Sequence, residues 1–143
     1  VVIGDFRDKV SYAEIDRVFR MIHNGSKILC TNKGKAFYRE DGAHIDTGGF
    51  VTMFEYATGK KGELLGKPSA GFFRLALDSL GVTENEAAVV GDDISTDVAG
   101  AKSIGSWSVL VKTGKYSGDA VGKAGIRPDF IIDSIASVKD ILI

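Results

Sequence analysis

Short apolar runs alternate with helix-like segments along the whole chain, and this alternation constrains the fold more than any other feature. Runs typical of buried strands occur at residues 1–4, 27–32, 63–66, 87–91, 106–114 and 129–133. Segments with helical spacing of apolar residues separate them, at residues 11–25, 50–58, 67–81, 96–104 and 134–143. The alternation predicts an α/β protein with a largely parallel sheet.

Several residues mark where these helices begin and end. Ser11 followed by Glu14 matches the capping-box pattern, and Pro68 is tolerated in the first turn of its helix. Residues 32–42 predict a polar loop with a short strand at AFY. The Gly- and Lys-rich stretch at 58–63 is the best internal boundary and predicts two domains, 1–60 and 61–143. Glycines suited to end a helix are Gly25, Gly59 and Gly81.

Composition excludes several classes of function. The 18 basic residues nearly balance the 19 acidic ones, so no strong field favours nucleic acid as a partner. No apolar run approaches the roughly 20 residues of a membrane span, which argues against a membrane partner.

The single Cys30 has no cysteine to pair with and is expected to be a buried, inert thiol. Trp107 opens a strand and is expected in the core, and the default location is cytoplasmic.

Ligands on parallel sheets sit beyond the carboxyl ends of the strands, so the loops that follow strands deserve inspection. These loops read TNKGK, GKPS, GDDISTD and VKTGKY. The third places Asp92, Asp93 and Asp97 within six positions, where like charges repel. Carboxylates suit Mg²⁺, which takes one or two of them together with waters and phosphate oxygens. The alternative is that the aspartates only cap a helix begun near Ser95.

Lys67 lies directly after a strand, where its ammonium can reach the same sheet edge as Asp92. A lysine there can neutralise a phosphate, while the alternative is a solvent-facing side chain. A nucleotide-binding P-loop is excluded because Gly62 is one residue too near and Pro68 replaces the Ser or Thr of that motif.

Taken together, GKPS, VVGDDISTD, AKSIG and VLVKTGKY resemble the later motifs of the haloacid dehalogenase (HAD) superfamily of phosphatases. Upstream, SYAEIDRVFRMIHNG, TNKGKAFYREDG and FVTMFEYATG resemble the α/β cap of its NagD-type subfamily. The resemblance covers nearly the whole chain. It implies the C-terminal half of a Rossmann-like three-layer core at 61–143 and a partial α/β cap at 1–60.

The resemblance also implies a Mg²⁺-dependent phosphatase that acts on small phosphorylated compounds through an aspartyl-phosphate intermediate. Pyrophosphate and phosphoamino acids belong to the same range of substrates. In that scheme Asp92 and Asp93 belong to the metal site, Asp97 supports it, and Lys67 balances charge between nucleophile and phosphate.

Within the resemblance, the loop TNKGK belongs to the cap, so Asn32, Lys33 and Lys35 are candidate substrate contacts. A solvated basic loop is the alternative reading of these three residues. The resemblance also allows a homodimer formed through the cap.

The family's nucleophile, an aspartate in a D-x-D motif after an apolar strand, has no counterpart in this sequence. DFRD at 5–8 has the wrong spacing, and its surroundings match the cap. The chain also begins within a strand and without methionine, which predicts a segment of a longer phosphatase that is inactive alone. Two alternatives remain: a non-catalytic binding or regulatory module of the same fold, and a receiver-like domain, in which the first 60 residues have no place.

Overall fold

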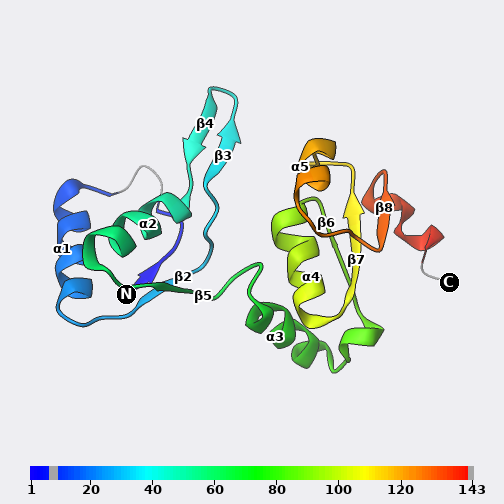
Figure 1. Cartoon of the computed structure of the whole chain (residues 1–143), viewed down its shortest axis with the longest axis horizontal. Coiled ribbons are helices and arrows are strands. Elements are labelled where there is room, and N and C mark those ends of the chain that lie inside the picture. Colours follow the sequence, from blue (N-terminus) through cyan, green and yellow to red (C-terminus); the bar gives the residue numbers. More distant parts are fainter. Residues whose placement is uncertain (7–9, 142–143) are drawn as a thin grey trace. The chain divides into compact units, whose positions relative to one another are not determined.

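The computed structural model describes residues 1–6 and 10–141, and the chain forms two compact units, Val1–Gly66 and Lys67–Ile143. Each unit contains a parallel three-stranded sheet accompanied by helices (Figure 1). The predicted α/β class is therefore confirmed. The DFRD pattern at 5–8 extends to Asp8, which lies outside the described residues.

The first unit is built on strands β1 (Val2–Ile3), β2 (Ile28–Cys30) and β5 (Gly62–Leu64), in the order β1-β2-β5. Helices α1 (Tyr12–His23) and α2 (Thr47–Thr58) lie beside each other and supply the rest of its core. Apolar spacing predicts this core because the inward side chains of α1 recur every three or four residues. Its buried members are Ile3, Ile22, Ile28, Cys30, Val51 and Phe54.

The unit boundary falls after Gly66 instead of at residue 60, because β5 belongs to the first sheet. Cys30 of β2 pairs with Leu64 of β5, so the chain leaves the first unit only beyond this strand. Cys30 is fully buried, its thiol donates to the Glu63 carbonyl at 3.3 Å, and burial raises its pKa. The thiol is thus protonated and structural, as the sequence predicts.

Residues 36–45 form an antiparallel hairpin where the sequence predicts a loop with one short strand. Strand β3 (Ala36–Arg39) pairs with β4 (Gly42–Ile45), and Gly42 has a φ of +123° beside the turn. The second strand lacks the β-branched run that identifies strands, and it exists because β3 supplies its backbone partners. Figure 1 shows the hairpin extending away from α1 and α2.

The second unit is built on strands β6 (Ala88–Gly91), β7 (Trp107–Val111) and β8 (Phe130–Ile132), in the order β6-β7-β8. Helices α3 (Ala70–Leu80) and α4 (Ala99–Ile104) pack closely together. A Cβ on Gly100 of α4 would come within 1.9 Å of the Phe73 ring. Only glycine therefore allows this approach of the two helices.

Helix boundaries follow the predicted residues in most places. Ser11 and Glu14 form the capping box, and Gly59 and Gly81 adopt the left-handed conformation after α2 and α3. The prediction for Pro68 is wrong, since α3 begins at Ala70.

Four further differences concern the second unit. The predicted helix at 96–104 consists of a π-helical turn, Ile94–Val98, followed by α4, and the predicted last helix is a 3₁₀ segment, Ile135–Asp140. A 3₁₀ turn at Glu84–Glu86 and the helix α5 (Gly118–Lys123) were not predicted. α5 was missed because it contains few apolar residues with helical spacing.

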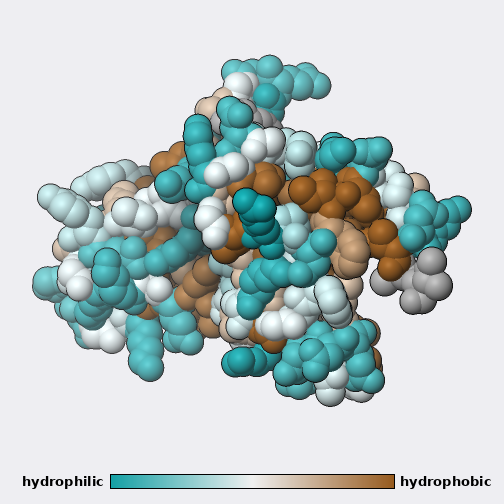
Figure 2. Space-filling model, turned by 45° about the vertical axis from the view of Figure 1, so that its right-hand side comes forward, coloured by the Kyte–Doolittle hydropathy of each residue, from teal (hydrophilic) through white to brown (hydrophobic). Residues whose placement is uncertain are grey.

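Large apolar side chains also reach the surface, and Figure 2 shows them gathered among hydrophilic residues on the face drawn. In the second unit, Leu75, Leu80 and Ile135 are each about two-thirds exposed or more. Trp107 is 51% exposed beside Phe130, so the prediction that it lies in the core is wrong. Within the described residues, none of the helices is long and apolar enough to cross a membrane.

A polar network around Asp129 ties α4 and β7 to the segment before β8. Asp129 Oδ2 accepts from the backbone and hydroxyl of buried Ser108 at 2.8 and 2.7 Å, and Oδ1 accepts from Lys102 Nζ at 2.6 Å. The Lys102 hydrogen bond, helped by those from Ser108, outweighs burial and lowers the pKa of Asp129 to about 2.

This network predicts an acid-sensitive contribution to stability. Since the folded pKa of Asp129 lies below its unfolded value of about 3.9, the contribution is complete above about pH 5 and is lost progressively as the pH falls towards 2. We expect Asp129→Asn to lower the free energy of unfolding at pH 7 by about 2 kcal/mol in urea denaturation. Asp133→Asn is the control, because Asp133 is 87% exposed in its pair with Lys112. Equal losses in the two variants would contradict the role of the network.

Candidate active site

Two loops of the second unit meet at one sheet edge because β6 and β7 are parallel neighbours. Gly91, the last residue of β6, pairs with Leu110 near the end of β7. Asp92 and Asp93, which directly follow β6, therefore lie beside the loop 112–117, which follows β7. This juxtaposition brings together the third and fourth loops that the sequence singles out.

Lys67 and Asp97 form an ion pair across thirty positions of sequence. Lys67 Nζ lies 2.7 Å from Asp97 Oδ1, and the Asp97 side chain is only 7% exposed whereas that of Lys67 is 48% exposed. The Asp93 backbone N–H donates to Asp97 Oδ2 at 3.2 Å. Both oxygens of Asp97 are thus occupied, and the buried carboxylate holds the lysine head while part of it stays open to solvent.

Gly91 is required by the same carboxylate. A Cβ at this position would lie 2.2 Å from Asp97 Oδ2, well inside van der Waals contact. The strand therefore ends on glycine because Asp97 folds back against its backbone.

Asp92 is half-buried and is held by the loop after β7. The Lys115 backbone N–H donates to Asp92 Oδ2 at 2.7 Å. Its other oxygen, Oδ1, accepts no hydrogen bond from the residues at 1–6 and 10–141. Asp92 is thus oriented through one oxygen and can offer the other to a ligand.

Asp93 caps the π-helical turn, as the alternative interpretation of the aspartates predicts. Asp93 Oδ1 accepts from the Ser95 backbone at 2.8 Å and from the Ser95 hydroxyl at 2.6 Å, and Lys115 Nζ lies 3.9 Å from Oδ2. Burial raises the pKa of Asp93, but the Ser95 hydrogen bonds and the charge of Lys115 outweigh it, so the pKa lies below its usual value. Asp93 is therefore ionised at neutral pH.

The three aspartates do not form a self-contained metal site. Among the described residues, no three His, Cys, Asp or Glu side chains are grouped so that they could hold a metal ion. Asp97 is committed to Lys67, which leaves Asp92, with support from Asp93, as the donor set. One or two carboxylates with waters fit Mg²⁺, which usually keeps several waters and is completed by phosphate oxygens.

The predicted substrate residues lie in the first unit, and two of them have structural partners there. Asn32 Oδ1 accepts from the Gly34 N–H at 3.0 Å, and its amide donates to Thr47 at 3.3 Å. Lys33 Nζ lies 2.8 Å from Glu55 Oε1. These contacts tie the loop to α2.

Lys33 is held by an ion pair with Glu55, whereas Lys35 forms no such pair among the described residues. The hydrogen bonds of Lys33 and the Gly62 N–H lower the pKa of Glu55 despite burial, so Glu55 stays charged. Lys35 is exposed, and its ammonium pairs with no carboxylate in the part of the chain that the structure describes. Of the three candidates, Lys35 alone keeps a cationic head available to a ligand.

Gly114 and Lys115 are the residues that the sequence analysis missed. The loop VKTGKY was singled out as a strand-end loop, but neither residue was assigned a role. The only signal in the sequence was a glycine and a lysine in a loop after a strand. The contact that matters is made by the Lys115 backbone N–H with Asp92, and a backbone contact cannot be predicted from residue type.

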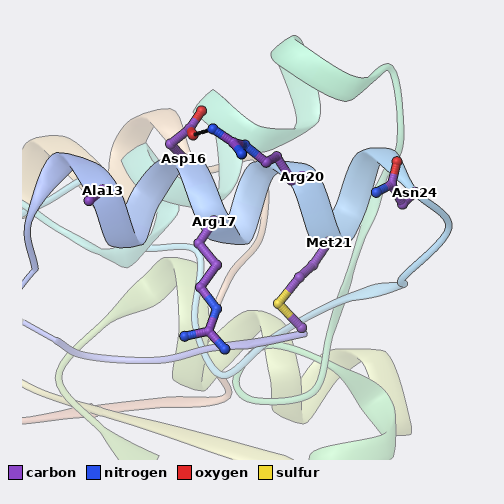
Figure 3. Close-up of a pocket in the computed structure, with 6 residues that line it drawn as sticks. All are labelled: Ala13, Asp16, Arg17, Arg20, Met21 and Asn24. Atoms are coloured by element: carbon purple, nitrogen blue, oxygen red, sulfur yellow. Dashed lines mark hydrogen bonds and ion pairs between the residues drawn. The ribbon is translucent and has the colours of Figure 1, made fainter.

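A surface hollow on the first unit is a different feature. It measures about 360 Å³ and is lined only by residues of α1 and its end, with Arg20 paired to Asp16 (Figure 3). The hollow contains none of the predicted site residues. Its lining comes from the outer face of α1, opposite the buried Ile22, and consists of Ala13, Asp16, Arg17, Arg20, Met21 and Asn24.

Comparison with known families decides what this arrangement belongs to. The family model described as HAD-hydrolase-like matches residues 64–138, which include Lys67, the three aspartates and Lys115. The chain belongs to this HAD-hydrolase-like family. The resemblance drawn from the motifs is thereby confirmed.

Individual relatives extend the similarity over the rest of this HAD-like chain. It is 37% identical over 145 residues to phospholysine phosphohistidine inorganic pyrophosphate phosphatase of Xenopus laevis, covering 100% of the chain and 54% of that protein. It is 35% identical over 140 residues to human haloacid dehalogenase-like hydrolase domain-containing protein 2, covering 98% and 54%. The chain thus spans about half the length of the curated relatives it matches.

Solved structures give the same result for the fold. The p-nitrophenyl phosphatase from Archaeoglobus fulgidus matches with a TM-score of 0.91 and 32% identity, over 99% of this chain and 56% of that one. NagD from E. coli K-12 matches with a TM-score of 0.82 and 26% identity, over 96% and 54%. These neighbours confirm the HAD fold of this chain.

The contact between Gly91 and Asp97 can be tested through stability. We expect Gly91→Ala to lower the free energy of unfolding by about 1–3 kcal/mol, because the new methyl group overpacks the buried carboxylate. Gly122→Ala is the control, since a Cβ there meets nothing within 4 Å. Urea denaturation measures both, and an unchanged Gly91→Ala variant would contradict the packing.

Proposed function

We propose that the protein to which this chain belongs is a Mg²⁺-dependent phosphatase of small phosphorylated compounds. The observation that carries the proposal is the Lys67 ammonium, anchored at 2.7 Å by buried Asp97 in the unit that also presents Asp92. Family membership and the phosphatases among the relatives support it. A fixed cation and a metal-binding carboxylate in one unit suit phosphoryl transfer, since that chemistry depends chiefly on positioning and charge neutralisation.

Each residue has a part in this proposal. Asp92, supported by Asp93, holds Mg²⁺, which when bound offsets the negative charge of the phosphate. Lys67 would bind a phosphate oxygen and the nucleophile's carboxylate, and Asp97 fixes the lysine's position. Asp97 acts through Lys67 and is therefore a positioning residue.

The nucleophile in this proposal is an aspartate supplied by a segment that this chain does not contain. Its carboxylate oxygen attacks phosphorus, the bond from phosphorus to the leaving oxygen breaks, and that oxygen takes a proton from an acid or from solvent. Water then attacks the aspartyl phosphate and gives up a proton, which releases inorganic phosphate and restores the carboxylate. The half-length match to relatives and the exposed apolar side chains of the second unit support a larger domain, and we expect this chain alone to be inactive.

The function can be tested in the full-length protein with p-nitrophenyl phosphate and Mg²⁺. We expect Lys67→Met to lower kcat/KM by about 100- to 1000-fold, because it removes charge stabilisation of the transferring phosphoryl group. Lys139→Met, which changes an exposed lysine outside these loops, should leave kcat/KM unchanged. Asp92→Asn should weaken Mg²⁺ binding as well as turnover. A full-length protein that binds Mg²⁺ but hydrolyses no phosphomonoester, pyrophosphate or phosphoamino acid would support the non-catalytic alternative.

The substrate role of the first unit gives a separate prediction. We expect Lys35→Ala to raise KM for a phosphorylated substrate without changing the melting temperature, because the Lys35 ammonium has no ion-pair partner among the described residues. Lys33→Ala should lower stability by about 0.5–1 kcal/mol, since it removes the partner of Glu55. Steady-state kinetics and thermal unfolding of both variants measure this, and the reverse pattern would assign the substrate contact to Lys33.

A further inference from the structure

The backbone of the loop after β7 contacts the carboxylate of Asp92, the residue that we propose binds Mg²⁺. Gly114 has a φ of +57°, and the next N–H, that of Lys115, donates to Asp92 Oδ2 at 2.7 Å. A Cβ on Gly114 would lie 1.9 Å from the same oxygen. The loop therefore touches Asp92 through a hydrogen-bond donor and through a position that admits no side chain.

Two separate constraints thus act on Gly114. The positive φ favours glycine whatever surrounds it, as at any left-handed position. The proximity of Asp92 excludes a Cβ even if the backbone tolerated one. Gly125 has only the first constraint, because its φ is +67° and a Cβ there would meet nothing within 4 Å.

The Lys115 side chain is not what holds Asp92. Its ammonium lies 3.9 Å from Asp93 Oδ2, and the side chain is 65% exposed. The contact with Asp92 belongs to the backbone, so it is independent of the residue type at 115. The conformation at Gly114 aims that N–H at the carboxylate.

We propose that Gly114 and the Lys115 backbone N–H are positioning elements for Asp92. They bind Oδ2 and so leave Oδ1, which accepts no hydrogen bond within the described residues, directed to Mg²⁺. A hydrogen bond to a metal-binding carboxylate fixes its orientation before the ion arrives and lowers the cost of binding. This inference rests on the proposed function, because it assumes that Asp92 is a metal ligand.

Two matched variants of the full-length protein distinguish the effect of backbone strain at a left-handed position from the effect of displacing the Asp92 carboxylate. Both Gly114→Ala and Gly125→Ala place a methyl group at a left-handed position, but only the first collides with a carboxylate. We expect Gly114→Ala to weaken Mg²⁺ binding by at least about tenfold in isothermal titration calorimetry, and Gly125→Ala to leave it unchanged. Equal affinities in these two variants would overturn the proposal.

Asp92→Asn in the same titration distinguishes this inference from the function on which it rests. If Asp92→Asn binds Mg²⁺ as the unaltered protein does, the metal assignment itself fails. If Asp92→Asn loses binding while Gly114→Ala matches Gly125→Ala, the metal site stands and only the positioning role fails.

Amide exchange gives a readout that does not require Gly114→Ala to fold. The Lys115 N–H should exchange about tenfold faster with solvent in Asp92→Ala than in the unaltered protein, because its acceptor is removed. Asp93→Ala is the control and should leave this exchange unchanged, since the Lys115 N–H donates to Asp92 and not to Asp93. Equal exchange in the unaltered protein and in Asp92→Ala would overturn the proposal.

Discussion

The parallel pairing of β6 with β7 is the constraint on which the candidate site depends. Parallel strands end at the same sheet edge, so Asp92 emerges from β6 beside the loop that follows β7. Without that pairing, the Lys115 N–H and Asp92, which are 23 positions apart in sequence, would have no reason to meet. The position of the site is thus a consequence of backbone hydrogen bonding before any side chain contributes.

The three aspartates can lie close together because each accepts a hydrogen bond from a different donor. Asp97 is satisfied by Lys67, Asp93 by Ser95, and Asp92 by the Lys115 N–H. Unpaired buried carboxylates would be costly, and hydrogen bonds to their charged forms offset the desolvation. Asp97 thus anchors Lys67, Asp93 caps the π-helical turn, and Asp92 keeps one oxygen that accepts no hydrogen bond within the described residues. One or two carboxylates suit Mg²⁺ better than a site formed by all three acids.

The two units differ in how firmly their residues are linked to the proposed chemistry. In the second unit, Lys67 and Asp92 lie among residues that the family model matches. In the first, Lys33 and Asn32 stabilise their own loop, and Lys35 alone keeps an unengaged charge among the predicted contacts. The roles of these residues stay proposals, and so does the correspondence of the units to a cap and a catalytic core.

The sequence by itself determined the α/β class, most strands, the main helix ends and the family, because apolar periodicity, capping residues and motif spacing are local properties. It also predicted that Lys67 and the aspartates share one edge of a sheet. Tertiary structure alone decided that β5 joins the first unit, that β4 exists, that Trp107 is exposed and that Asp97 anchors Lys67. It also brought Gly114 and the Lys115 N–H to Asp92. These outcomes depend on contacts between segments that are distant in sequence. Every residue except proline has a backbone N–H, so the residue type does not reveal which acceptor that N–H will bind.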